Sequence, residues 1–272
     1  MYTKMTTDFK IKEFNIKIPE ESCSWIVLGP PGSGKSSFVE DLIRYNMERF
    51  PVARINTNIP KGYERFLKIF PPIFVFNNFN IKQEQEFVNK RQKPMSISKN
   101  RAKHCIYLLD DIENAEEAFK SSFFDELFKR GTRHYNLLTI VVSQYAMTLA
   151  PPLRSASSYI AIFKFTSEAD RKKLYNNFGG TTIFGNEKKF YECLDLLTGD
   201  YSCMIIKQGT ASNDPKDCVF YYKAEPKNNW KFNPEFKALW KWDEDRCDKK
   251  RANRYFESDN QIEKPIYSRR QG

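Results

Sequence analysis

Short apolar runs of strand length alternate along the chain with longer stretches of helical character. The runs at 24–28, 105–109, 137–143 and 158–165 are largely apolar, without strict alternation of apolar and polar positions. Runs of this kind are typical of strands buried on both faces, as in parallel sheets. The pattern therefore predicts an α/β fold with a mostly parallel central sheet and helices on both faces.

Weaker patterns in the sequence predict further strands and helices around these four strands. Residues 14–18 are expected to form an opening strand that pairs outside the main sheet, and 52–56 and 73–77 are expected to be further strands. The runs at 204–207 and 219–222 flank a polar turn and predict a β-hairpin. Helices are predicted at 38–50, 63–69, 81–91, 114–130 and 167–178, with Gly131 ending the fourth and Gly179-Gly180 ending the fifth.

Residues 29–36 read Gly-Pro-Pro-Gly-Ser-Gly-Lys-Ser, which matches the phosphate-binding loop (P-loop) pattern G-x-x-x-x-G-K-[ST]. The loop lies between a predicted strand and a predicted helix, as this motif requires. Glycines let backbone N–H groups wrap a polyphosphate, and the helix start adds partial positive charge. The expected nucleotide contacts are Gly29, Gly32, Ser33, Gly34, Lys35, Ser36 and Ser37.

Polar side chains at two strand ends complete the expected site. Lys35 would reach the β- and γ-phosphates of ATP, and Ser36 would bind Mg²⁺ together with Asp110, which ends the run at 105–109. The next residue, Asp111, would orient or deprotonate the attacking water. Gln144 ends the run at 137–143 and would sense the γ-phosphate. Carboxyl ends of parallel strands meet at one sheet edge, so these groups are predicted to converge.

Composition indicates the kind of partner, the role of the cysteines and the relation to membranes. A net charge of +10 and a pI near 9.2 favour an acidic partner such as nucleic acid. Six cysteines stand singly with no C-x-x-C pair, so neither a disulfide partner nor a zinc cluster is expected. The apolar runs are too short to span a bilayer, and the N-terminus shows no secretion segment.

Basic residues gather in two places. The segment 87–109 has no acidic residue and carries six lysines and arginines, so an exposed loop is expected there, either a solvated surface loop or one that contacts DNA phosphates, and the family resemblance described below favours the second. The C-terminal stretch mixes aromatic and basic residues, and we expect it to dock on the core and end in a loose basic tail. The chain is therefore divided into a P-loop ATPase domain at 1–222 and a basic, aromatic extension at 223–272.

Four elements in order, the P-loop, the acidic strand, Arg133-His134 before the next strand, and Leu149-Ala-Pro-Pro-Leu-Arg154, carry a family resemblance. Over about residues 20–165 the chain resembles the poxvirus-type genome-packaging ATPases of large cytoplasmic DNA viruses, within the FtsK/HerA-like P-loop translocase superfamily. The resemblance implies a RecA-like/ASCE fold and a trans-acting arginine finger at Arg133, with Arg130 and Arg154 as alternatives. The superfamily usually has glutamate where this chain has Asp111, which leaves Glu113 as an alternative base.

The function implied is ATP-driven translocation of double-stranded DNA into a viral capsid, with ATP and Mg²⁺ as cofactors. ATP would be hydrolysed between subunits of a homo-oligomeric ring, a hexamer or a pentamer. Further partners would be a capsid or membrane component at the site of packaging, and the location would be the virus factory in the host cytoplasm or the virion. Two alternatives stay open: a nucleoside or nucleotide kinase, with Arg171-Lys172-Lys173 clamping phosphate, and a nucleotide-switched DNA-binding protein.

Overall fold

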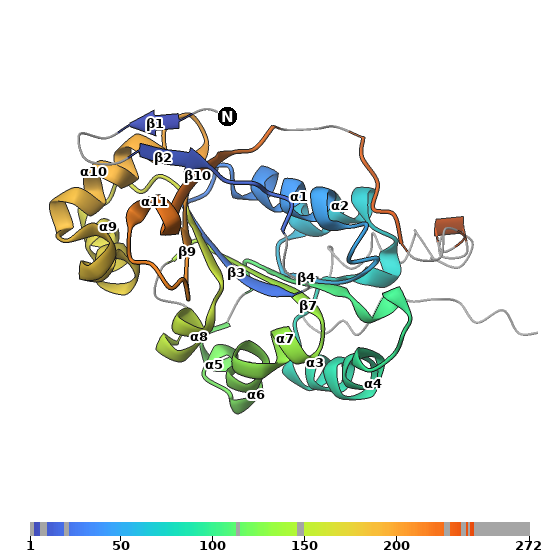
Figure 1. Cartoon of the computed structure of the whole chain (residues 1–272). Coiled ribbons are helices and arrows are strands. Elements are labelled where there is room, and N and C mark those ends of the chain that lie inside the picture. The colour runs from blue at the N-terminus through green and yellow to red at the C-terminus, as the bar shows by residue number, and fades with distance from the viewer. Residues whose placement is uncertain are drawn as a thin grey trace, which may run out of the picture.

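The computed structural model describes residues 3–5, 10–18, 22–112, 115–145, 150–225, 229–234, 238 and 240–241. In this part of the chain ten strands form one sheet in the order β1-β2-β10-β9-β8-β3-β7-β6-β4-β5, with helices on both faces (Figure 1). The strands are β1 (Thr3–Met5), β2 (Lys10–Glu13), β3 (Cys23–Leu28), β4 (Val52–Thr57), β5 (Val75–Phe76), β6 (Cys105–Asp110), β7 (Leu137–Ser143), β8 (Tyr159–Ile162), β9 (Ser202–Lys207) and β10 (Val219–Lys223).

The predicted α/β class with a mostly parallel sheet is confirmed. From β5 through β4, β6, β7 and β3 to β8, every neighbouring pair of strands is parallel. Strand β9 is antiparallel to β8, and β10 is antiparallel to β9, which gives the expected hairpin. Strand β7 lies between the P-loop strand β3 and the acidic strand β6.

Helices cover the sheet in two layers with separate cores. Helices α1 (Lys35–Asn46) and α2 (Pro60–Ile69) pack on one face, and the remaining long helices pack on the other. Residues of β3 alternate between the cores, with Trp25 on the α1 side and Ile26 on the opposite side. The other helices are η1 (Pro72–Phe74), α3 (Ile81–Phe87), η2 (Val88–Gln92), α4 (Lys93–Ser96), η3 (Arg101–Lys103), α5 (Ala115–Phe119), α6 (Ser122–Glu126), η4 (Leu127–Gly131), α7 (Thr132–His134), α8 (Pro151–Ala156), α9 (Glu168–Leu174), η5 (Tyr175–Phe184), α10 (Glu187–Leu197) and α11 (Pro215–Cys218).

The opening strand differs from its prediction. The ladder is formed by β2 at Lys10–Glu13, which pairs with β10 inside the main sheet, so the expectation of a strand at 14–18 outside the sheet is wrong. Residues Phe14, Ile16 and Ile18 are instead buried in the core under α1. Their apolar alternation reflects this packing and not a strand ladder.

Two predicted elements differ from expectation, one in its length and the other in its continuity. The strand at 73–77 is reduced to β5, because the 3₁₀ turn η1 occupies Pro72–Phe74. The helix at 114–130 is divided into α5, α6 and the π-helix η4. Gly131 does not end this helix: its φ is −62°, and α7 continues to His134. A Cβ at Gly131 would lie 2.9 Å from side-chain atoms of Leu127 and of Tyr135, so close packing explains this glycine.

The region after β8 also departs from the sequence pattern. Helix α9 is followed by the π-helical stretch η5, which continues through Gly179 and kinks at Gly180, where φ is 38°. The expected end of the helix at this glycine pair is therefore a kink. Helix α10 was not predicted, although its buried positions Phe190, Cys193, Leu194 and Leu197 follow helical spacing.

Helical turns replace most of the expected basic loop at 87–109. Segments η2, α4 and η3 cover much of it, and several of its basic residues have partners within the chain. Lys90 pairs with Glu86 at 3.4 Å, and Arg91 donates to the carbonyl of Ala102 at 2.7 Å. The prediction of an exposed loop is wrong for 88–96, where the buried Gln92 ties the segment to the carbonyls of Lys103 and Tyr135, and it holds for 97–100, which lie outside the helical segments and are mostly exposed. Contact with DNA stays a prediction.

The chain beyond β10 returns to the α1 face. Phe232 is buried against Phe70 of α2, with ring centroids 4.7 Å apart, and Trp230 lies beside Phe70 at 6.3 Å. This contact accords with the expected docking of the aromatic extension. Trp242 and the basic residues at 249–251 and 269–270 lie outside the described residues.

Candidate nucleotide-binding site

The P-loop has a conformation that depends on its glycines. Gly32 and Gly34 adopt φ values of 73° and 107°, which are strained for residues with a Cβ. A Cβ on Gly29 would lie 2.6 Å from Oγ of Ser33 and 2.7 Å from Cβ of Phe163. The loop thus leaves the end of β3 and enters α1 with its backbone close to Phe163, as a phosphate cradle requires.

Lys35 lies at the centre of the site. Its side chain is buried, and its Nζ donates to the carbonyl of Gly29 at 2.6 Å and to that of Pro30 at 3.1 Å. Burial lowers the pKa of the Lys35 ammonium, while Asp111 and Asp110 raise it. The P-loop lysine and both aspartates therefore share one electrostatic environment, so the loop and the acidic strand converge as the sequence predicted.

Asp110 occupies a buried position at the end of β6. The pKa of Asp110 is raised to about 6, mainly by burial and in smaller part by the neighbouring Asp111 carboxylate, while Arg65 and Lys35 limit the rise. Nη2 of Arg65 approaches Oδ2 of Asp110 at 3.5 Å. Helix α2 comes this close because of Gly62, where a Cβ would lie 2.8 Å from Oγ1 of Thr57 and 3.4 Å from Oδ2 of Asp110. Sequence reasoning missed Arg65 and Gly62.

Asp111 and Gln144 contact each other across the strand ends. Nε2 of Gln144 donates to Oδ2 of Asp111 at 3.2 Å, and the backbone N–H of Asp111 donates to the carbonyl of Val142. The backbone of Asp111 has a φ of 46°, in the left-handed region where a non-glycine residue is uncommon. The predicted water-orienting acid and the predicted sensor thus form one unit. Glu113, the alternative base, lies outside the described residues.

A cavity of about 450 Å³ lies beside the P-loop. One wall consists of residues 32–37, and Ser36 presents an exposed hydroxyl at the start of α1. The other wall was not found by sequence reasoning, because no motif marks it. It is formed by Asp200, Tyr201, Lys223 and Ala224.

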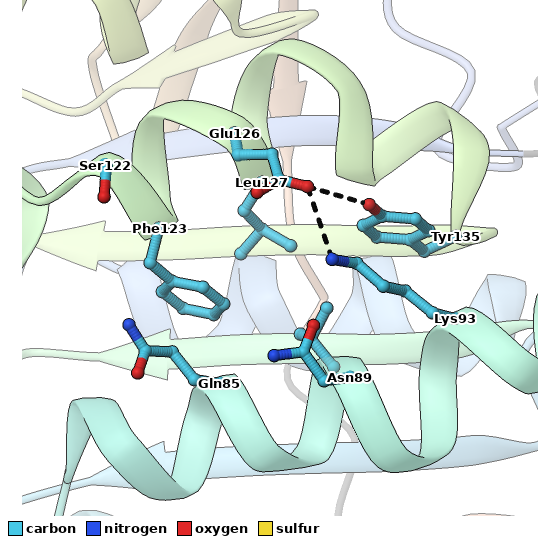
Figure 2. A pocket seen from close by; sticks show the side chains of 9 residues that line it. Gln85, Asn89, Lys93, Ser122, Phe123, Glu126, Leu127 and Tyr135 are labelled. Atoms are coloured by element: carbon cyan, nitrogen blue, oxygen red, sulfur yellow. Dashed lines mark hydrogen bonds and ion pairs between the residues drawn. The ribbon is translucent and has the colours of Figure 1, made fainter.

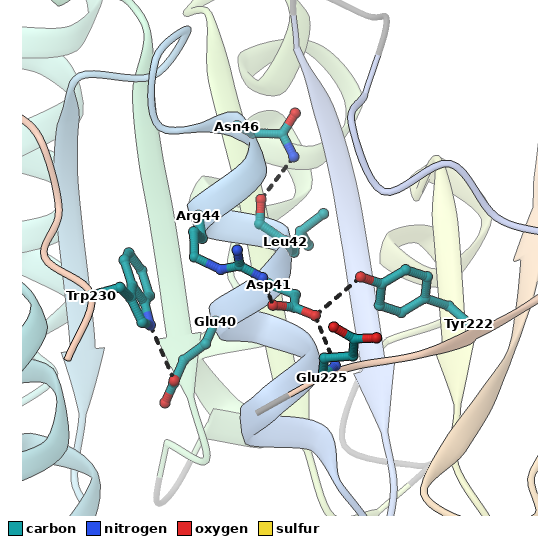
Figure 3. Close-up of polar contacts among 8 residues, drawn as sticks. All are labelled: Glu40, Asp41, Leu42, Arg44, Asn46, Tyr222, Glu225 and Trp230. Atoms are coloured by element: carbon teal, nitrogen blue, oxygen red, sulfur yellow. Dashed lines mark hydrogen bonds and ion pairs between the residues drawn. The ribbon is translucent and has the colours of Figure 1, made fainter. Parts of the chain in front are cut away.

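Polar contacts behind the P-loop fix helix α1 (Figure 3). Oδ2 of Asp41 accepts from the hydroxyl of Tyr222 at 3.0 Å and from the backbone N–H of Glu225 at 3.2 Å, and Asp41 also pairs with Arg44. On the neighbouring side of the helix, Glu40 accepts from Nε1 of Trp230 at 3.4 Å. These contacts join α1 to β10 and to the chain that follows it.

The side-chain oxygens of Ser36 and Asp110 can bind Mg²⁺ only if phosphate oxygens supply further ligands. Within the described residues no three His, Cys, Asp or Glu side chains gather to hold a metal ion. Magnesium is usually held by one or two carboxylates together with substrate phosphates. Ser36 and Asp110 offer such a partial set, and a divalent cation would offset the burial of the Asp110 carboxylate. The site residues therefore fit this ion.

The candidate arginine fingers lie away from this site. Arg133 is exposed on α7, just before the amino end of β7, whereas the P-loop lies at the carboxyl end of the parallel strands. Strand β7 has seven residues, so its two ends are roughly 20 Å apart. Arg130 is also exposed, and Arg154 of α8 is half-buried. The fold does not bring Arg133 to its own P-loop.

A second cavity, of about 190 Å³, lies between η2 and the α6–η4 segment (Figure 2). Glu126 lies near Nζ of Lys93 at 3.4 Å and accepts from the hydroxyl of Tyr135 at 3.1 Å. Phe123 and Leu127 supply apolar lining. None of the predicted site residues lines this cavity, so the P-loop cavity is the candidate site. No helix in the described part of the chain is long and apolar enough to cross a bilayer.

No protein-family model matches the chain. Among curated proteins, it is 29% identical over 215 residues to the uncharacterized protein 088R of Invertebrate iridescent virus 3, covering 79% of this chain and 80% of that protein. It is 27% identical over 200 residues to the uncharacterized protein 015R of Frog virus 3, covering 73% of this chain and 61% of that protein. The similar proteins thus come from DNA viruses.

Solved structures identify the fold. The DNA-packaging ATPase B204 from Sulfolobus Turreted Icosahedral Virus superposes with a TM-score of 0.55 at 14% identity, covering 77% of this chain and all of B204. The chain has the fold of viral genome-packaging ATPases. B204 of Sulfolobus turreted icosahedral virus 2, in complex with AMP, gives 0.53 at 14% identity over 76% of this chain and all of that one.

The same fold extends beyond viral proteins. The conjugation coupling protein TcpA of pCW3, in its monomer form with ATPgS, gives a TM-score of 0.53 at 14% identity, covering 82% of this chain and 64% of TcpA. The P-loop ATPase fold and the resemblance to genome-packaging ATPases, both expected from the sequence, are therefore confirmed.

Proposed function

We propose that this protein is an ATPase that translocates double-stranded DNA and packages a viral genome. The observation that carries the proposal is the convergence of Lys35, Asp110, Asp111 and Gln144 at one edge of a packaging-ATPase fold. The exposed Arg133 at the opposite edge supports hydrolysis between subunits. B204 and TcpA, whose fold the chain shares, act in DNA packaging and conjugation coupling respectively, which favours DNA as the substrate of movement.

Within one subunit the residues divide the work on ATP. Backbone N–H groups of the P-loop bind the phosphates, and Lys35 moves from the Gly29 and Pro30 carbonyls to the β- and γ-phosphates. Ser36 and Asp110 would hold Mg²⁺, which neutralises charge on the triphosphate when bound. Asp111 orients the attacking water and accepts its proton. Gln144 holds the Asp111 carboxylate in place through the 3.2 Å hydrogen bond.

A neighbouring subunit completes the site in this proposal. Arg133 would reach the γ-phosphate bound by the next copy in a ring of six or five subunits, where it would stabilise the charge of the transition state. An arginine at the far end of β7 cannot do this for its own nucleotide, because the length of the strand separates them. An isolated subunit is therefore expected to be a poor ATPase.

The partners follow from charge and from fold. The net charge of +10 suits binding to the DNA backbone without reading sequence. A capsid or membrane component at the site of packaging completes the assembly, and the virus factory in the host cytoplasm or the virion is the expected location.

Contacts of α9 weaken the kinase alternative. Arg171 pairs with Asp195 at 2.6 Å, Lys172 pairs with Glu187, and Lys173 lies 3.3 Å from Asp170. These basic residues are engaged on their own face of the molecule and do not line the P-loop cavity. They give no support for a phosphate-clamping lid, and an acidic pair with a strand-end glutamine suits activation of water better.

The decisive experiment measures release of inorganic phosphate from ATP, with and without long double-stranded DNA, over a range of protein concentrations. We expect turnover to rise steeply with protein concentration, because the sites are shared, and to rise further with DNA. A kinase would consume ATP only as a phosphorylated acceptor appears. Salt-sensitive DNA binding without hydrolysis would identify the nucleotide-switched DNA-binding protein instead.

A further inference from the structure

The cavity beside the P-loop has a second wall that phosphate binding does not use. It consists of the turn at 199–201 and the end of β10, with Asp200, Tyr201, Lys223 and Ala224 facing the loop. Strand β9 is antiparallel to β8 and begins at Ser202, so this turn lies at the carboxyl edge of the parallel strands. The end of β10 lies at the same edge, because Lys223 is the register partner of Ser202.

Sheet order places this wall on the opposite side of the P-loop from the aspartates. The P-loop strand β3 has β7 and β6, which carry Gln144 and Asp110, on one side, and β8, β9 and β10 on the other. The γ-phosphate end of a bound nucleotide must face the catalytic aspartates. The opposite end of the molecule, the nucleoside, is therefore directed toward the turn at 199–201.

The turn is held firmly against the P-loop. A Cβ on Gly34 would lie 3.2 Å from the carbonyl oxygen of Tyr201, so loop and turn are in direct contact. Asp200 and Tyr201 have φ values of 52° and 59°, two consecutive left-handed residues without glycine. Such backbone costs free energy and persists where the surroundings fix it. Here Asp200 forms an ion pair with Lys223, which ties the turn to β10.

Tyr201 has the character of a binding surface. The residue is 65% exposed, although it belongs to those that line the cavity. A flat aromatic ring exposed beside a phosphate cradle can stack on a nucleobase, and a carboxylate can accept hydrogen bonds from ribose hydroxyls. The cavity volume of about 450 Å³ falls within the range of small-molecule sites.

We propose that the turn at 199–201 binds the nucleoside half of the nucleoside triphosphate. Tyr201 stacks on the base, Asp200 accepts from the ribose hydroxyls, and Lys223 holds the Asp200 carboxylate. Stacking recognises any purine face, so ATP and GTP bind with similar affinity, while inorganic tripolyphosphate binds more weakly. This inference rests on the proposed nucleotide site and adds the residues that recognise the nucleoside.

Calorimetric titration of the full chain with Mg²⁺ and non-hydrolysable ATP tests the inference. We expect Tyr201→Ala to weaken binding about 10-fold, since loss of a stacking ring has an effect of this order. Tyr201→Phe keeps the ring and should retain the affinity. Tyr45→Ala is the control, because Tyr45 is an exposed tyrosine of α1 that does not line the cavity. Tripolyphosphate should bind wild type and Tyr201→Ala equally.

The outcomes separate this inference from the proposed function. If the ATP analogue binds wild type but Tyr201→Ala binds it equally well, the nucleoside lies elsewhere and the phosphate site stands. An equal loss of tripolyphosphate affinity in Tyr201→Ala would mean that the ring only shapes the P-loop, which also overturns the inference. Failure of wild type to bind either probe would overturn the nucleotide site itself.

Discussion

The two ends of strand β7 differ in how much of a functional site each end holds. At its carboxyl end Gln144 meets Asp111, and the P-loop and Asp110 lie alongside, so most parts of a nucleotide site belong to one chain. At its amino end Arg133 is exposed on a short helical turn. In the proposed function, the carboxyl end binds ATP within one chain, whereas Arg133 at the amino end acts on the nucleotide of a second subunit. Binding and turnover should therefore respond to different mutations.

The largest expected effect lies at the amino end. Arg133→Ala should lower DNA-stimulated ATP turnover about 10³-fold or more under assembled conditions, because a trans arginine can supply that much transition-state stabilisation. Affinity for the ATP analogue should stay unchanged. Steady-state phosphate release and calorimetric binding measure the two quantities on the same sample.

Arg130→Ala is the matched control, since Arg130 is exposed three residues earlier. It should keep most of the turnover. If instead Arg133→Ala retains full activity and Arg130→Ala or Arg154→Ala loses it, the finger is that other arginine, and the proposed trans site must be rebuilt around it.

At the carboxyl end the expected effect is on binding. Lys35→Ala should weaken affinity for the ATP analogue roughly 10- to 100-fold, the range for loss of a charge-assisted hydrogen bond. Lys68→Ala removes one positive charge at an exposed site on α2 and should bind normally. Normal binding by Lys35→Ala, measured by the same titration, would show that the P-loop does not hold the phosphates.

The same contrast explains what the sequence predicted well. The P-loop, the acidic strand and the sensor strand are contiguous motifs, and parallel strands bring their carboxyl ends together. Arg65 and Gly62 carry no motif, and they meet Asp110 only because α2 crosses the end of β6. Tyr201 joins the P-loop from far along the chain, through the antiparallel β9. Contacts between distant segments depend on packing, which no local pattern reveals.

The predicted ends of two helices are wrong for a related reason. Gly131 and Gly179 lie where a local pattern predicts a helix end, yet η4 is followed directly by α7 at Gly131, and η5 continues past Gly179. At Gly131 a tyrosine and a leucine side chain fill the space that a Cβ would take, so tertiary packing selects the glycine. Residues 88–96 of the basic segment were misjudged in the same way, because the buried Gln92 holds them to the core.

The smallest expected effect concerns stability at the carboxyl end. Burial raises the pKa of Asp110 to about 6, above its value in the unfolded chain. As pH rises from about 4 to about 6, the unfolded state loses this proton first, so the group lowers the free energy of unfolding. Above about pH 6 this loss has its full value and no longer changes with pH. Asp110→Asn should therefore be more stable than wild type at pH 7 and equally stable at pH 4.

Denaturant unfolding at the two pH values measures this difference, with Asp195→Asn as the control. Arg171 lowers the pKa of Asp195, so that substitution should give no gain at pH 7. A gain for Asp110→Asn at pH 7, together with loss of Mg²⁺-dependent hydrolysis, would show that the carboxyl end retains a buried charge at a cost to stability because the nucleotide site needs it. Equal stability of wild type and Asp110→Asn at both pH values would instead mean that Arg65 and Lys35 fully offset the burial of Asp110.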